Sequence, residues 1–130
     1  CKVAGSKLIV VLGHSKCGAV KGACDHVEMG NLTELLSKIQ PAVYQEKETS
    51  DDRTSKNSGF VENVAEINVK RSVKNIIERS FVLEQMLEEG QIGIVGAMHD
   101  IESGKVIFYD DVMYIKDNSN PEFTVSDLRH

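Results

Sequence analysis

The sequence has no apolar run that approaches the roughly 20 residues needed to cross a bilayer, so no membrane segment is expected in this chain. It also lacks the charged start, apolar stretch and cleavage site of a secretory signal. Basic residues are in the minority, with 15 Lys and Arg against 20 Asp and Glu, and the net charge of −5 argues against nucleic acid as a partner. The cysteines number only three. An odd, small set of this kind is typical of a reducing compartment, so we expect a cytoplasmic protein.

The chain of 130 residues is long enough for one domain with a buried core. Its apolar content of 41% and charged content of 27% are ordinary for a globular protein. We therefore predict a single domain over residues 1–130, in which residues 116–130, rich in Asn, Ser and Pro, form a loosely held tail. The chain begins at Cys1 and enters an apolar run within a few residues, so we interpret its start as a boundary within a longer protein.

Three apolar segments predict strands. Leu8–Leu12 is a continuous apolar run rich in β-branched residues, typical of a strand buried on both faces of a parallel sheet, and Ile92–Met98 predicts a second strand of this buried type. Glu102–Gly104 predicts a hairpin turn and Lys105–Tyr109 the returning strand. Apolar residues at helical spacing predict helices over 18–26, 31–39 with a restart near Pro41, 60–77 and 80–90, and the polar residues 46–59 predict a loop. This order of elements predicts an α/β domain.

A run with metal-binding chemistry lies where the first strand ends and the first helix begins. His14 and Cys17 are three residues apart, and an imidazole and a thiolate at this spacing can reach one tetrahedral zinc ion. The helix N-terminus would favour the thiolate, and Gly13 and Gly18 would let the backbone turn tightly. Spacing alone also fits a core histidine beside a buried thiol, so both interpretations stay open here.

Other candidate ligands are weaker. Cys24 lies two helical turns beyond Cys17, roughly 10 Å along the axis, which is too far for one metal ion. We expect Cys24 to be a small buried residue and His26 to be solvated, and we do not expect Cys1 to be a ligand. His99 is expected at the surface, and Asp100 is expected to hydrogen-bond nearby backbone in the hairpin.

Three segments in the right order resemble the β-class carbonic anhydrases. Residues 7–20, KLIVVLGHSKCGAV, are similar to the zinc-ligand segment of that family that runs from a strand into G-H-S-x-C-G-A. Residues 63–75 are similar to its long helix, and residues 94–106 are similar to its last hairpin. The chain is therefore identified as a member of this family, matching its C-terminal part.

The resemblance implies a site and an activity. His14 and Cys17 would be two of three protein ligands to Zn²⁺, and Gly18 would line the substrate pocket. The family's third ligand is a cysteine in an earlier C-x-D-S-R motif, which does not occur in this sequence. The implied reaction is the reversible hydration of CO₂ to bicarbonate and a proton. Because one ligand is missing, we predict that the isolated chain binds zinc weakly or not at all and is inactive, and we assign no catalytic residue.

The resemblance also implies a fold and an assembly. The fold would be a small, mostly parallel sheet flanked by helices, with a C-terminal antiparallel hairpin strand and with truncation at the N-terminus. The strand over Leu8–Leu12 would then have an unpaired edge, so we expect a homo-oligomer. Two alternatives to the enzyme remain at this point. The domain could be the cytoplasmic part of an anion or bicarbonate transporter, or it could be a metal-free assembly or binding module.

Overall fold

The computed structural model describes residues 5, 7–27 and 30–115 of the chain. The predicted tail over residues 116–130 and Cys1 lie outside the described residues. The elements in chain order are β1 (Leu8–His14), α1 (Gly18–Cys24), α2 (Asn31–Ser37), α3 (Gln40–Gln45), α4 (Ser58–Arg79), α5 (Phe81–Glu88), β2 (Gly93–His99) and β3 (Val106–Ile115).

The strands form one mixed sheet in the order β1-β2-β3. Strand β1 runs parallel to β2, and β3 returns antiparallel to β2, so the predicted α/β fold and its antiparallel hairpin strand are confirmed. The sheet therefore contains one parallel and one antiparallel strand pairing. Strand β3 continues to Ile115, well past the predicted end at Tyr109, because it bulges where its register shifts opposite Val95 and Ala97 and then pairs again.

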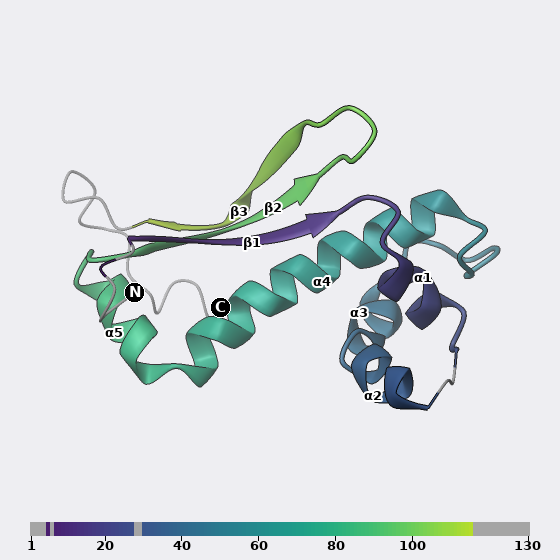
Figure 1. Cartoon of the computed structure of the whole chain (residues 1–130), viewed down its shortest axis with the longest axis horizontal. Helices are drawn as coiled ribbons and strands as arrows, with labels where there is room; N and C mark the ends of the chain where they lie inside the picture. The colour runs from purple at the N-terminus through teal and green to yellow at the C-terminus, as the bar shows by residue number, and fades with distance from the viewer. Residues whose placement is uncertain (1–4, 6, 28–29, 116–130) are drawn as a thin grey trace.

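Helix α4 lies along one face of the sheet, with α1, α2 and α3 grouped at one end and α5 at the other (Figure 1). The contact between α4 and the sheet is very close at Gly96, where an added Cβ would lie 3.0 Å from Cγ1 of Val69. One core cluster joins α4 to β2, β3 and α5, and a second joins α4 to α1 and α3. The long helix therefore belongs to both parts of the core.

The prediction that β1 is buried on both faces was wrong. Leu8, Val10 and Leu12 are 52%, 44% and 53% exposed, whereas Ile9 and Val11 pack against the core. Successive side chains of a strand point to opposite faces, and among the described residues α4 covers only one of them. An unbroken apolar run does not show by itself which faces have a covering layer.

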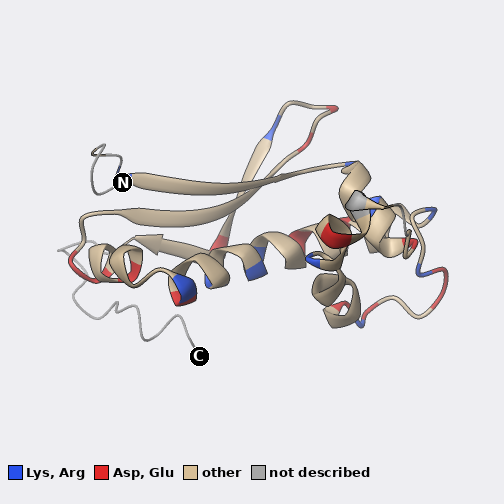
Figure 2. Ribbon diagram, turned by 60° about the horizontal axis from the view of Figure 1, so that its bottom comes forward, with Lys and Arg blue, Asp and Glu red and all other residues tan. Residues whose placement is uncertain are grey.

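Figure 2 shows β1 and β2 free of charged residues along their length, with the charges on helices, on loops and on β3.

The helix boundaries follow local signals. The chain turns after α2 and restarts at α3, where Pro41 stands in the first turn as predicted. Asn57 accepts a hydrogen bond from the Phe60 amide at the start of α4. Ser80 accepts one from the Leu83 amide at the start of α5, so Ser80 caps this helix and lies just before its first residue.

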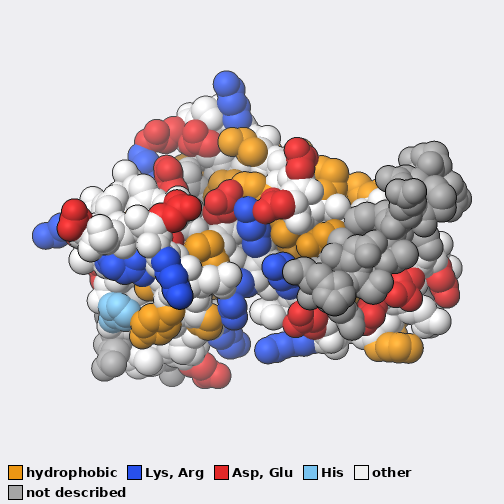
Figure 3. Space-filling view, turned by 180° about the vertical axis from the view of Figure 1, so that it is seen from behind, with side chains coloured by type: hydrophobic (Ala, Val, Ile, Leu, Met, Phe, Trp, Pro, Cys, Tyr) orange, Lys and Arg blue, Asp and Glu red, His pale blue; other side chains and the backbone are white. Residues whose placement is uncertain are grey.

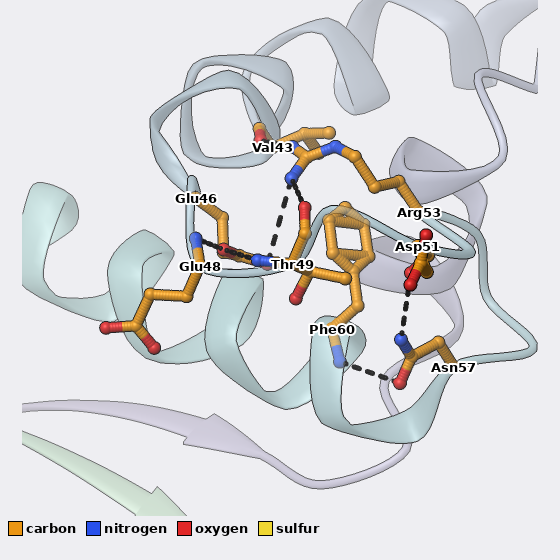
Figure 4. Close-up of polar contacts among 8 residues, drawn as sticks. All are labelled: Val43, Glu46, Glu48, Thr49, Asp51, Arg53, Asn57 and Phe60. Carbon is orange, nitrogen blue, oxygen red and sulfur yellow. Dashed lines mark hydrogen bonds and ion pairs between the residues drawn. The ribbon is translucent and has the colours of Figure 1, made fainter.

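The predicted polar loop runs between α3 and α4 and is fastened by a buried acid. Glu46 is only 2% exposed, and its Oε1 accepts hydrogen bonds from the amides of Glu48 and Thr49. Arg53 donates to the carbonyl oxygens of Val43 and Thr49 and lies over the Phe60 ring, 4.6 Å from its centroid (Figure 4). The loop is thus anchored to both flanking helices.

Among the described residues, no helix is both long and apolar enough to cross a membrane.

Candidate functional site

His14 and Cys17 lie at the carboxyl end of β1. His14 is the last residue of that strand and pairs in register with His99, the last residue of β2. Cys17 directly precedes α1 and occupies its N-cap position in an extended conformation. Between them, Lys16 has a φ of 57°, a left-handed conformation that reverses the chain. Sites in open α/β sheets gather at this end of the strands, as predicted for this pair.

Both side chains line one cleft with a volume of about 490 Å³. The carboxyl end of β1, the first half of α4 and the β2–β3 hairpin form its walls. The cleft is lined by His14, Ser15, Lys16, Cys17, Val61, Glu62, Asn63, Ala65, Glu66, Met98, Asp100, Glu102, Ile107 and Tyr109. The structure therefore brings the imidazole and the thiol to a common cavity.

The environments of the two side chains suit metal binding. His14 is exposed, and its Nδ1 lies 3.0 Å from the carbonyl oxygen of Ser15. When Nδ1 carries the proton and donates to that oxygen, Nε2 keeps its lone pair for a metal ion. Cys17 is a free thiol of intermediate exposure, and it makes no capping hydrogen bond to α1.

The described residues do not complete a zinc site. Among them, no group of three or more His, Cys, Asp or Glu side chains is arranged to hold a metal ion. His14 and Cys17 have the right donor chemistry, an imidazole nitrogen and a sulfur, but a closed or catalytic zinc site uses at least three protein ligands. The donor set of the described part of the chain is therefore incomplete.

No sequence pattern predicted the contacts that hold the turn between His14 and Cys17 in place. The Ser15 hydroxyl accepts a hydrogen bond from the Ile101 amide at 3.0 Å and lies 3.4 Å from Oδ1 of Asp100, to which it donates. The Lys16 ammonium forms an ion pair with Glu102. These partners are 85 or 86 residues away in the chain, so only the parallel pairing of β1 with β2 brings them together.

The other residues singled out from the sequence take separate roles. Cys24 is 1% exposed, and burial, reinforced by the charge of Asp25, raises the pKa of its thiol to about 11, so the prediction of a small buried residue is confirmed. His26 is exposed beside Tyr44, as expected. Asp100 accepts the Glu102 amide, which confirms its predicted hairpin role.

Gly18 is the exposed first residue of α1, and a Cβ placed on it would meet nothing within 4 Å. It is absent from the set of residues that line the cleft. Its contact with substrate stays a prediction. Gly13, in contrast, is required sterically, because a Cβ there would lie 2.7 Å from Cγ2 of Val69. Close packing against α4 thus replaces the tight turn that the sequence suggested for this glycine.

A charged network closes the far side of the cleft. Lys70 lies 2.7 Å from Asp111 and 3.6 Å from Glu66, and its ammonium is 5.2 Å from the centroid of the Tyr109 ring. Burial alone would lower the pKa of Lys70, but the hydrogen bond to Asp111 and the charge of Glu66 outweigh it and raise that pKa. Burial next to these carboxylates raises the pKa of Tyr109 to about 12, so its hydroxyl stays protonated at neutral pH.

On the face shown in Figure 3, acidic and basic side chains lie mixed among apolar ones.

Comparison with known proteins gives consistent matches. A family model described as carbonic anhydrase matches residues 1–106. Carbonic anhydrase 2 of Mycobacterium tuberculosis is 26% identical over 110 residues, which cover 81% of this chain and 50% of that protein. A carbonic anhydrase of Mycolicibacterium smegmatis is 27% identical over 104 residues, 76% of this chain and 47% of that protein. The chain thus spans about half the length of these curated relatives.

Solved structures share the fold. A tetrameric β-carbonic anhydrase from Sordaria macrospora superposes with a TM-score of 0.67 at 24% identity, covering 80% of this chain and 52% of the other. The β-carbonic anhydrase of Coccomyxa, solved with acetazolamide, superposes with a TM-score of 0.68 at 19% identity, covering 95% of this chain and 55% of the other.

Proposed function

Because the chain belongs to the β-class carbonic anhydrase family, we propose that it is the part of such an enzyme that supplies the zinc ligands His14 and Cys17 for the reversible hydration of CO₂. The products would be bicarbonate and a proton. The observation that carries the proposal is that the imidazole and the thiol line the same cleft at the carboxyl end of β1. A zinc ion held at such a site would act as a Lewis acid and generate a nucleophile at neutral pH.

The residues of this chain would bind and position the substrate. Val61, Ala65 and Met98 form an apolar part of the cleft wall, which suits a small uncharged molecule such as CO₂. The proton on Nδ1 of His14 would be held by the Ser15 carbonyl, which leaves Nε2 for the metal. Gly18 is proposed to border the substrate where α1 begins.

The isolated chain is proposed to be inactive. Two protein ligands hold zinc weakly, and the described residues contribute no third donor to the pair. The chain is also proposed to work as a homo-oligomer, because β1 leaves an apolar face exposed and one similar solved structure is tetrameric. A cytoplasmic location is proposed from the free thiols of Cys17 and Cys24.

Metal binding and turnover test the proposal separately. Cobalt(II) titrated into the chain should produce a thiolate-to-cobalt charge-transfer band that is lost in both His14→Ala and Cys17→Ser. The variant Cys24→Ala is the control, since its thiol is buried away from the cleft, and it should keep the band. Stopped-flow CO₂ hydration with added zinc should show no rate above buffer for the chain alone.

Two results would count against the proposal. A cobalt band that survives both substitutions would show that His14 and Cys17 are not a ligand pair. CO₂ hydration by the isolated chain would contradict the proposed inactivity. If Cys17→Ser then abolished that hydration, the activity would still be assigned to the site of His14 and Cys17.

A further inference from the structure

The turn between the two proposed ligands is built against the β2–β3 hairpin. Because β1 and β2 are parallel and end in register at His14 and His99, the segments that follow them leave the sheet side by side. The Ser15 amide donates to the His99 carbonyl oxygen at 2.9 Å, which extends the pairing by one residue beyond the strands. The ligand turn therefore starts in a fixed place relative to the hairpin.

The side chain of Ser15 joins the two segments a second time. Its hydroxyl accepts the Ile101 amide at 3.0 Å and donates to Oδ1 of Asp100 at 3.4 Å. The same Oδ1 accepts the Glu102 amide at 3.0 Å. One carboxylate oxygen thus fixes the start of the hairpin turn and the serine of the ligand turn together.

The hairpin in turn is rigidly closed. The Asp100 amide donates to the Lys105 carbonyl at 2.8 Å, and the Gly104 amide donates to the Asp100 carbonyl at 2.8 Å. Gly104 has a φ of 77°, which glycine adopts without strain. The Asp100 amide and carbonyl oxygen are therefore both fixed by hydrogen bonds within the hairpin, and these bonds do not depend on the contact between its carboxylate and Ser15.

The ligand turn needs such support because its own conformation is unfavourable. Lys16 has a φ of 57°, and a residue with a Cβ adopts this left-handed conformation only at a cost in free energy. This reversal at Lys16 is what brings Cys17 back toward the cleft that His14 also lines. The hairpin supplies contacts to this turn, among them the ion pair between the exposed side chains of Lys16 and Glu102.

We propose that Ser15 and Asp100 are positioning residues, which hold the turn between His14 and Cys17 so that both side chains face the cleft before a metal ion binds. This rests on the proposed function in so far as His14 and Cys17 are the ligands. Neither Ser15 nor Asp100 acts as a metal donor in this arrangement. They act through the backbone of the turn, and the hairpin becomes part of the metal site without contributing a ligand.

The test compares Ser15→Ala and Asp100→Ala with the control Ser103→Ala. Ser103 is an exposed serine of the same hairpin whose hydroxyl accepts the Lys105 amide, and within the described part of the chain it forms no hydrogen bond to the ligand turn. Three quantities are measured on the 130-residue chain: cobalt(II) affinity, hydrogen exchange of the amide at position 15, and the urea midpoint of global unfolding. Ser15→Thr, which keeps the hydroxyl, and Asp100→Asn, which keeps Oδ1 as an acceptor, are the rescue variants.

We expect Ser15→Ala and Asp100→Ala to weaken cobalt binding about 10-fold or more, the range found when a group that orients a metal ligand is lost. Exchange at position 15 should accelerate by a similar factor. Ser103→Ala should change neither quantity more than about 2-fold, and the rescue variants should recover most of the wild-type affinity. Comparing the changes in cobalt affinity and in exchange at position 15 with the change in the urea midpoint separates a positioning effect from a general loss of stability.

The outcomes are distinguishable. Unchanged exchange at position 15 in Asp100→Ala would overturn the positioning role, and so would an equal effect of Ser103→Ala. If an alanine variant fails to fold, Asp100→Asn and Ser15→Thr provide the test instead. The proposal requires both of these variants to keep hydrogen exchange at position 15 and cobalt affinity close to wild type. If the cobalt band of the chain survives both His14→Ala and Cys17→Ser while exchange at position 15 still depends on Asp100, the positioning role stands and the ligand assignment of the proposed function fails.

Discussion

Gly13 and Val69 are packed so closely that a Cβ on Gly13 would lie 2.7 Å from Cγ2 of Val69 and 3.0 Å from the Met98 methyl. This contact fixes the distance between the end of β1 and helix α4 immediately before His14. The cleft lies between the same two elements, so its width depends on a residue that has no side chain.

Gly13→Ala is therefore expected to destabilise the chain by about 1–3 kcal/mol, as overpacking of a core contact does. Urea unfolding measures the change, and Val69→Ala in the same chain should reduce the penalty of Gly13→Ala. Gly18→Ala is the matched control, because a Cβ at the start of α1 meets nothing within 4 Å. Equal stabilities of the two glycine variants would refute this account of the contact.

Lys16 offers a test of backbone strain. Both Lys16→Gly and Lys16→Ala remove the ion pair with Glu102, but only glycine tolerates a φ of 57° without strain. We expect Lys16→Gly to be more stable than Lys16→Ala by about 1 kcal/mol, the balance of relieved strain and greater freedom of the unfolded chain. Thermal or urea unfolding of both variants gives the difference directly. A more stable alanine variant would show that the turn is not left-handed in solution.

Glu46 predicts an acid-dependent loss of stability. Burial by itself raises the pKa of Glu46, but hydrogen bonds from Thr49 and Glu48 and the charge of Arg53 outweigh it, so its pKa lies below the ordinary 4.5. A carboxylate with a lowered pKa in the folded state contributes stability that is present above its unfolded pKa and is lost as the pH falls through the folded value. Glu46 should therefore stabilise the loop at neutral pH and stop doing so well below pH 4.5.

Glu46→Gln tests this directly. At pH 7 the variant should lose about 1–3 kcal/mol, because the partly buried hydrogen bonds from the Glu48 and Thr49 amides lose a charged acceptor. The difference from wild type should shrink as the pH is lowered below the ordinary carboxyl pKa of 4.5 and through the lowered pKa of Glu46. Glu48→Gln is the control, since Glu48 is exposed and its side chain points away from the anchoring contacts (Figure 4). A difference that does not depend on pH would contradict the assignment of the charge to Glu46.

The exposed face of β1 predicts self-association. Leu12→Lys should move the chain toward the monomer in sedimentation velocity, because a charge on an edge strand opposes pairing with another copy. Leu35→Lys on α2 is the control, because Leu35 is 50% exposed and Leu12 is 53% exposed. Wild-type chain that is monomeric at all concentrations would rule out the proposed homo-oligomer for this chain.

The two described thiols should react very differently. A maleimide at neutral pH should label Cys17 in the cleft well before Cys24, whose burial raises its pKa to about 11. Peptide mass spectrometry distinguishes the sites, and urea should make Cys24 reactive. Added zinc should slow labelling of Cys17 in the wild type more than in His14→Ala. Equal protection in both would argue against a shared metal ion.

Much of the site could be predicted from the sequence because its signals are local. The apolar run ending at Gly13, the spacing of His14 and Cys17, and the helix starting at Gly18 all lie within a few residues of one another. Ser80 as a cap and the restart at Pro41 are also local, since each depends on the backbone groups of one turn. The family resemblance added the ordering of three such segments.

The chain itself therefore determined where its strands and helices begin and which two donors stand together at a strand end. Only the tertiary structure decided that β1 has one bare face, that Gly13 is needed by Val69, and that Asp100 reaches Ser15. These depend on pairings between residues that are 56 or 85 positions apart in the sequence. Contacts of that kind arise only when a whole sheet and a helix have packed, because no short stretch of sequence encodes which distant surface will cover it.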